Sequence, residues 1–105
     1  MEKRNFYRLN YPPSARPALL IGGKSYELLN ISEKGLKYAH PGSDLPAAGS
    51  PLTGTIVFAD KEKLEVEGSV LRSIGTEIVV TLDPGIPFAR IIAEQRRFLK
   101  TPPDL

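Results

Sequence analysis

The 105-residue sequence contains no cysteine and only one histidine, His40. Without cysteine the chain cannot form a disulfide, bind a metal through a thiolate or use a thiol as nucleophile. His40 has no second histidine with which to complete a metal site or a nucleophile–base pair. The glycines form neither a phosphate loop nor a dinucleotide fingerprint. We therefore expect a protein that is not an enzyme and that carries no metal and no cofactor.

Long apolar runs are also missing. The longest, such as residues 18–21 and 78–80, are only a few residues long, whereas a membrane-spanning helix needs roughly 20 apolar residues. No segment looks like a secretory signal. We expect a cytoplasmic protein that does not insert into a membrane, and the length suits a single domain over residues 1–105.

An excess of charge of either sign is absent, because the formal net charge is +2. This value is too small to indicate a nucleic-acid polymer as the partner. Basic residues nevertheless gather near both ends of the chain: Lys3, Arg4, Arg8, Arg90, Arg96, Arg97 and Lys100. Local basic clusters on a nearly neutral domain suit a small anion better than a long polyanion.

Short strand patterns follow one another along residues 18–83. Gly22-Gly23 supplies the positive φ angles of a tight hairpin turn, and alternate residues are apolar or small near the end of this region. The expected strands cover residues 18–21, 25–30, 36–39, 53–58, 64–70 and 78–82. Six short strands with turn signals about every ten residues indicate an antiparallel barrel or sandwich.

Residues 86–100 change to a helical period, with Pro87 suited to the first turn. Arg90 and Glu94 are spaced to pair across one turn. The apolar face is expected to hold Phe88, Ile91, Ile92, Phe98 and Leu99, and the polar face Arg90, Glu94 and Arg97. We expect the helix to pack against the strands, with a partner-binding helix as the alternative.

Two short motifs stand out from this background. Arg4 and Arg8 form R-x-x-x-R, and Asn30, Ser32 and Gly35 form N-x-S-x-x-G at the turn between the second and third expected strands. Each motif alone is weak evidence for a family. Their order, followed by the remaining expected strands and the helix, is much more specific. Over nearly its whole length the sequence resembles the PilZ domain family, which binds cyclic di-GMP.

The resemblance implies an all-β fold, a six-stranded antiparallel barrel with one C-terminal helix. Residues 1–17 would form a flexible arm that wraps the ligand, residues 18–83 the barrel and residues 86–100 the helix. The implied function is that of a bacterial cyclic di-GMP receptor that changes shape and signals to a protein partner, which the sequence does not identify. Binding should order the arm and alter the surface offered to that partner.

The family's ligand contacts carry over to the matching positions. Arg4 and Arg8 are implied to contact phosphate and the guanine Hoogsteen edges, where an arginine fork can pair bidentately. Asn30 and Ser32 are implied to contact guanine through an amide and a hydroxyl. Gly35 would permit a backbone geometry or a close approach that a Cβ would block.

Structural explanations and rival functions remain beside this interpretation. Asn30 and Ser32 could simply hold a turn, and the arginines could be solvated charges. Phe6 and Tyr7 are candidates to anchor the arm on the barrel or to stack on a base, and Arg72 is a candidate to stack on a guanine face. The main alternative function is a PilZ-like interaction module that binds no nucleotide. A second is a barrel for single-stranded nucleic acid, which needs an aromatic platform beside a basic groove. The aromatic residues of the expected strands are Tyr26, Tyr38 and Phe58.

Overall fold

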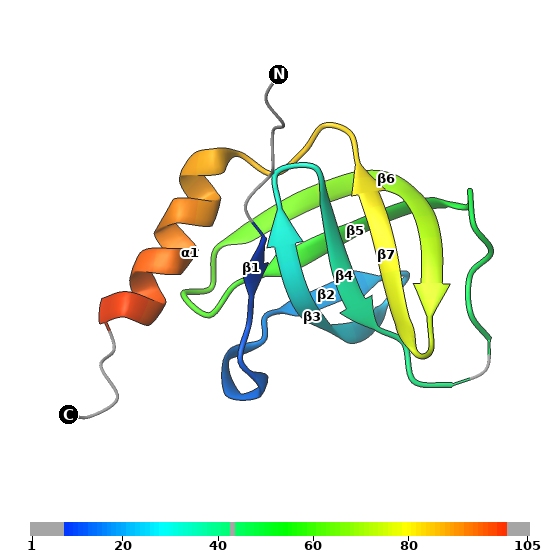
Figure 1. The fold of residues 1–105 in the computed structure, drawn as a ribbon, viewed down its shortest axis with the longest axis horizontal. Coiled ribbons are helices and arrows are strands. Elements are labelled where there is room, and N and C mark those ends of the chain that lie inside the picture. The colour runs from blue at the N-terminus through cyan, green and yellow to red at the C-terminus, as the bar shows by residue number, and fades with distance from the viewer. Residues whose placement is uncertain (1–7, 43, 101–105) are drawn as a thin grey trace, which may run out of the picture.

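A computed structural model describes residues 8–42 and 44–100, with side chains described as far as Arg97. Within these ranges the chain forms seven strands, one 3-10 helix and one α-helix (Figure 1). The strands are β1 (Leu9–Asn10), β2 (Ala18–Ile21), β3 (Lys24–Ser32), β4 (Gly35–Ala39), β5 (Pro51–Val57), β6 (Lys63–Ile74) and β7 (Glu77–Leu82). The helices are η1 (Pro13–Ala15) and α1 (Phe88–Lys100).

Strands β2 to β7 close into the six-stranded antiparallel barrel that the sequence predicts. Neighbouring strands follow the order β3-β2-β5-β6-β7-β4, and β4 pairs back onto β3 to complete the ring. A closed ring leaves no strand edge unpaired. The prediction of an all-β fold with one C-terminal helix is confirmed.

Strand β1 is an addition that the sequence analysis did not predict. It pairs antiparallel with β3, with Leu9 opposite Ile31 and Asn10 opposite Asn30. Within the arm predicted over residues 1–17, Leu9 and Tyr11 are thus buried against the barrel. The mobility of the arm without ligand stays a prediction.

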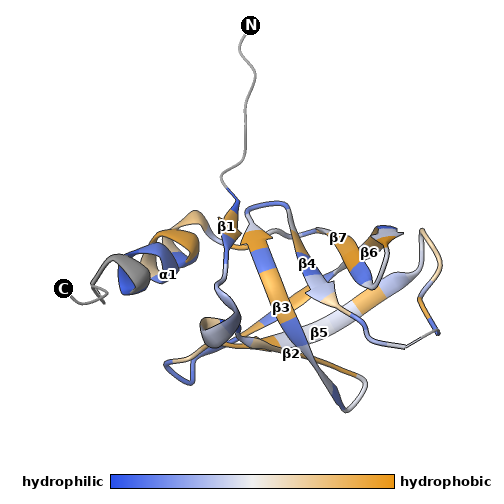
Figure 2. Cartoon of the chain, turned by 60° about the horizontal axis from the view of Figure 1, so that its bottom comes forward, coloured by the Kyte–Doolittle hydropathy of each residue, from blue (hydrophilic) through white to orange (hydrophobic). Residues whose placement is uncertain are grey.

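Alternation along the strands builds the core. Figure 2 shows polar and apolar residues following one another along β3. On β6, Val66 and Val70 point inward and are buried, while Glu65 and Glu67 on either side of Val66 are exposed. Successive side chains of a strand point to opposite faces, so each strand contributes every second residue to the interior. The fully enclosed core residues include Leu19, Leu28, Ile31, Ile56, Ile78 and Ile91.

Helix α1 lies at one side of the barrel, next to β1 (Figure 1). It begins directly after Pro87, and its Ile91 is buried in the core. The predicted division of its faces is wrong at two positions: Glu94 is buried and Phe88 is 52% exposed. The reason is that Glu94 finds charged and hydrogen-bonding partners inside, as described below. No helix within the described residues is long and apolar enough to span a membrane.

Candidate ligand-binding site

The N-x-S-x-x-G motif forms the hairpin that connects β3 to β4. Asn30 and Ser32 lie at the end of β3, and Gly35 begins β4 directly opposite Ser32. Ile31 between them points into the core and is fully buried, so Asn30 and Ser32 face the other side of the strand. The Ser32 hydroxyl donates to the Gly35 carbonyl across the turn at 3.4 Å.

Gly35 is required by a close backbone approach. A Cβ at this position would lie 2.5 Å from the carbonyl oxygen of Val80 on β7, far inside van der Waals contact. Of the two reasons that the sequence suggests for this glycine, the structure supports the close approach. The glycine lets β4 and β7 pair closely beside the motif.

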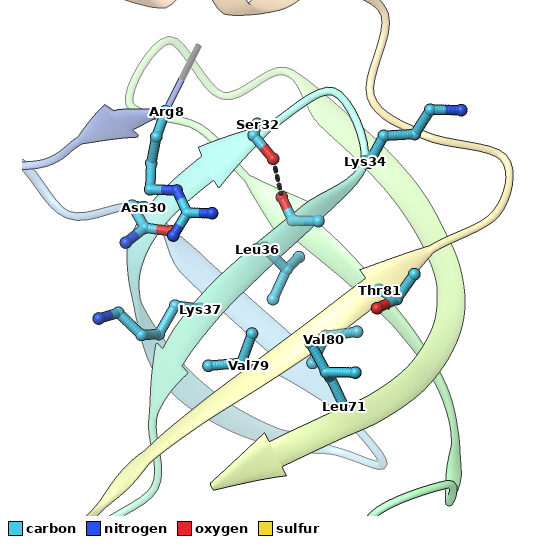
Figure 3. Close-up of a pocket in the computed structure, with 11 residues that line it drawn as sticks. Arg8, Asn30, Ser32, Lys34, Leu36, Lys37, Leu71, Val79, Val80 and Thr81 are labelled. Carbon is cyan, nitrogen blue, oxygen red and sulfur yellow. Dashed lines mark hydrogen bonds between the residues drawn. The ribbon is translucent and has the colours of Figure 1, made fainter. Parts of the chain in front are cut away.

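A hollow of about 150 Å³ opens beside this hairpin (Figure 3). Four residues that the two motifs single out line it: Arg8, Asn30, Ser32 and Gly35. The other lining residues are Lys34, Leu36, Lys37, Leu71, Val79, Val80 and Thr81. Arg4 lies outside the described residues. The structure therefore brings Arg8 of the first motif together with the second motif.

The charge around the hollow is positive. Arg8 and Lys34 are exposed, and neither has an ion pair within the described part of the chain. Lys37 pairs with Glu77 at 3.0 Å. Among the described residues, no carboxylate lines the hollow. A concave surface whose charged lining residues are all cations attracts anions.

Asn30 presents an unused amide to this space. The residue is 5% exposed, and its side chain makes no hydrogen bond to any other described residue. Figure 3 shows the amide beside the guanidinium of Arg8. A carboxamide carries two donors and an acceptor, so Asn30 offers both to a molecule in the hollow.

The motifs did not reveal the residues that other strands bring to the hollow. Leu71 is 54% exposed on β6, because a register shift between Val70 and Arg72 interrupts the alternation there. Val79 comes from β7. The pair of adjacent apolar residues Val70-Leu71 was a usable sequence signal for this break. Arg72, considered for stacking on a base, is not among the described residues that line the hollow.

Tyr11 joins the arm to strand β3 and to helix α1. Its backbone N–H donates to the Leu29 carbonyl at 3.0 Å, and its hydroxyl donates to Glu94 Oε1 at 2.8 Å. Burial raises the pKa of the Tyr11 phenol far above its usual value, and the charge and hydrogen bond of Glu94 add to the effect. The hydrogen bond to Glu94 likewise raises the pKa of Arg97.

The aromatic residues Tyr26, Tyr38 and Phe58, all in the described part of the chain, do not form the exposed platform that a single-stranded nucleic-acid binder needs. Tyr38 and Phe58 are each 2% exposed, and Tyr26 is half-buried. The Tyr26 ring stacks on His40 with centroids 5.2 Å apart. These rings are occupied by one another and by the core, which disfavours that alternative.

The fold and the hollow define a small β-barrel suited to binding an anionic ligand. The model of the PilZ domain family matches residues 2–101, nearly the whole chain. The chain therefore belongs to the PilZ family, whose domains are cyclic di-GMP-binding adaptors rather than enzymes. A search of curated proteins found no match.

Proposed function

We propose that this chain is a cyclic di-GMP receptor that binds the messenger in the hollow beside the β3–β4 hairpin. The observation that carries the proposal is the unpaired amide of Asn30, which faces a hollow whose charged lining residues are Arg8, Lys34 and Lys37. An amide that faces an open hollow can bond to a molecule that enters it. A guanine edge supplies both the acceptors and the donors that this amide lacks.

The lining residues suit the separate parts of the ligand. The planar fork of Arg8 can pair with a phosphate or with guanine O6 and N7, and Arg4 would supply a second fork. The Ser32 hydroxyl adds a further polar group. Leu71 and Val79 provide an apolar surface on which a base can lie flat.

The size of the hollow supports a part for the arm in binding. Its volume of about 150 Å³ is below the roughly 300–1,000 Å³ typical of pockets that enclose a drug-sized ligand. A ligand with two guanines and two phosphates therefore extends beyond the hollow. The arm that carries Arg8 covers the rest, and its closure alters the surface presented to a protein partner in the cytoplasm.

Isothermal titration of cyclic di-GMP tests the proposal, with GTP and GMP as competing controls. We expect saturable and selective binding by the wild type. Arg8→Ala should weaken binding by roughly 10- to 150-fold, because a hydrogen bond to a charged group is worth about 1.5–3 kcal/mol. Arg96→Ala is the matched control: Arg96 is exposed on α1 and does not line the hollow, so its removal should leave the affinity unchanged.

Two results would change the conclusion. If Arg8→Ala binds as tightly as the wild type, the assignment of the site is wrong. If the wild type takes up no ligand at high concentration, the chain is instead an interaction module of the PilZ family that binds no nucleotide. The same titration gives the number of ligand molecules per chain.

A further inference from the structure

The buried carboxylate of Glu94 on α1 holds the tyrosine at which the arm meets the barrel. Glu94 is 1% exposed. Its Oε1 accepts hydrogen bonds from the Tyr11 hydroxyl and from Arg97, both at 2.8 Å, and its Oε2 accepts one from Arg90 at 3.3 Å. A buried carboxylate is stable only where it is paired and hydrogen-bonded, and Glu94 has both kinds of partner.

Glu94 is a fixed anchor because its neighbours tie α1 to the barrel. The Arg90 guanidinium lies 3.9 Å from the centroid of the Phe58 ring and 3.2 Å from Asp60 Oδ1. Phe58 and Asp60 belong to the connection between β5 and β6. The backbone N–H of Glu62 and the Arg90 guanidinium hold the pKa of Asp60 below its usual value, so this carboxylate stays available to Arg90.

Tyr11 in turn fixes the position of Arg8. The two residues are three positions apart, and the strand between them, β1, has only two residues. Those residues pair with Ile31 and Asn30, at the end of β3 that carries the second motif. Such a short ladder provides few hydrogen bonds of its own, so the hold on Tyr11 decides whether Arg8 stays beside the hollow.

We propose that Glu94, acting through Tyr11, is a positioning residue for Arg8 and thereby for ligand binding. The inference rests on the proposed function and extends it, because it gives α1 a part in holding the messenger. When the bond between the Tyr11 hydroxyl and Glu94 is lost, β1 separates more often from β3. Affinity then falls in proportion to the fraction of molecules that keep Arg8 in place.

The coupling acts in both directions. Binding free energies are reciprocal between linked sites, so a ligand that holds Arg8 also strengthens the contact between Tyr11 and Glu94. The messenger therefore stabilises the docking of α1 on the barrel. This connects the ligand site to a helix whose outer face, including the exposed Phe88, is open to a partner.

Tyr11→Phe tests the inference because it removes only the hydroxyl and leaves the ring in the core. Glu94 Oε1 keeps its bond from Arg97, so the fold should survive. We expect the affinity for cyclic di-GMP to fall about 3- to 10-fold, a part of the factor that a hydrogen bond to a charged group contributes. Tyr26→Phe is the matched control, since it removes the same hydroxyl from a tyrosine that neither lines the hollow nor donates to Glu94. It should leave the affinity unchanged.

A double-mutant cycle with Arg8→Gln separates positioning from a merely structural effect. If Tyr11 acts by placing Arg8, then Arg8→Gln costs less affinity in the Tyr11→Phe background than in the wild type. Hydrogen exchange without ligand provides a second measurement. The backbone amide of residue 11 should exchange faster in Tyr11→Phe than in the wild type or in Tyr26→Phe.

The outcomes distinguish this inference from the function on which it rests. Equal affinities and equal exchange in Tyr11→Phe and the wild type would overturn the positioning role and leave the receptor function intact. Additive losses in the cycle would also overturn it. If the wild type does not bind cyclic di-GMP at all, the proposed function fails and the inference fails with it.

Discussion

The buried phenol of Tyr11 should make the domain lose stability in alkaline solution. Burial raises its folded-state pKa first, and the negative charge of Glu94 and their hydrogen bond raise it further. In the unfolded chain the phenol ionises near its ordinary value of 10.0. A group whose pKa is raised by folding stabilises the protein fully below the unfolded pKa. That stabilisation is lost as the pH rises toward the folded pKa.

The size of the loss follows from the same linkage. Above pH 10 each pH unit costs about 1.4 kcal/mol of stability per proton released on unfolding. Between about pH 9 and about pH 11 the unfolded phenol passes through its pKa while the folded phenol stays protonated. The contribution of Tyr11 over this interval integrates to about 1.4 kcal/mol.

Urea unfolding followed by circular dichroism measures this loss in the wild type and in Tyr11→Phe. The free energy of unfolding of the wild type, relative to that of Tyr11→Phe, should fall by about 1.4 kcal/mol from about pH 9 to about pH 11. Lysines and other tyrosines titrate in both proteins and cancel in the comparison. Tyr38→Phe is a positive control, because burial also raises the pKa of Tyr38. A gap that is the same at both pH values would refute the burial of the hydroxyl against Glu94.

Two further predictions concern the residues that support the site. Glu94→Gln leaves Arg90 and Arg97 without their shared carboxylate. Since these two side chains are 20% and 29% exposed, the cost should be about 2–4 kcal/mol, somewhat below the roughly 3–5 kcal/mol of a fully buried pair. Calorimetry should then show Tm lowered by roughly 10 to 25 °C, whereas the exposed Glu65→Gln should melt like the wild type. Gly35→Ala forces a Cβ against the Val80 carbonyl and should cost about 1–3 kcal/mol in urea unfolding; an unchanged midpoint would mean that β7 moves aside freely.

The barrel was predictable because its strands carry their own periodic signal. Alternation and turn residues marked each of β2 to β7, although β6 continues to Ile74, beyond the predicted end at residue 70. That extension follows from pairing with β7 past an irregular register, which no local pattern encodes. Strand β1 was missed because two residues, Leu9 and Asn10, are too few to show a period.

The site was predictable only where its residues lie close together in the sequence. Asn30, Ser32 and Gly35 form one hairpin, so their spacing alone places them side by side. Leu71 and Val79 reach the hollow through the register of strands around the barrel, which spacing along the chain does not reveal. Glu94 was placed on the polar face of α1 because helical periodicity cannot foresee buried cationic partners.

The residues of the N-x-S-x-x-G motif carry different information about ligand binding. Gly35 is demanded by the backbone of β7, and the Ser32 hydroxyl already bonds across the hairpin. The fold needs both residues even when no ligand is bound. Loss of binding after their substitution therefore cannot show whether a ligand contact or the hairpin itself was lost. The amide of Asn30 serves no other described residue, and Arg8 is exposed without a described ion pair. It is therefore these two residues, rather than the complete motif, on which a claim of ligand recognition depends.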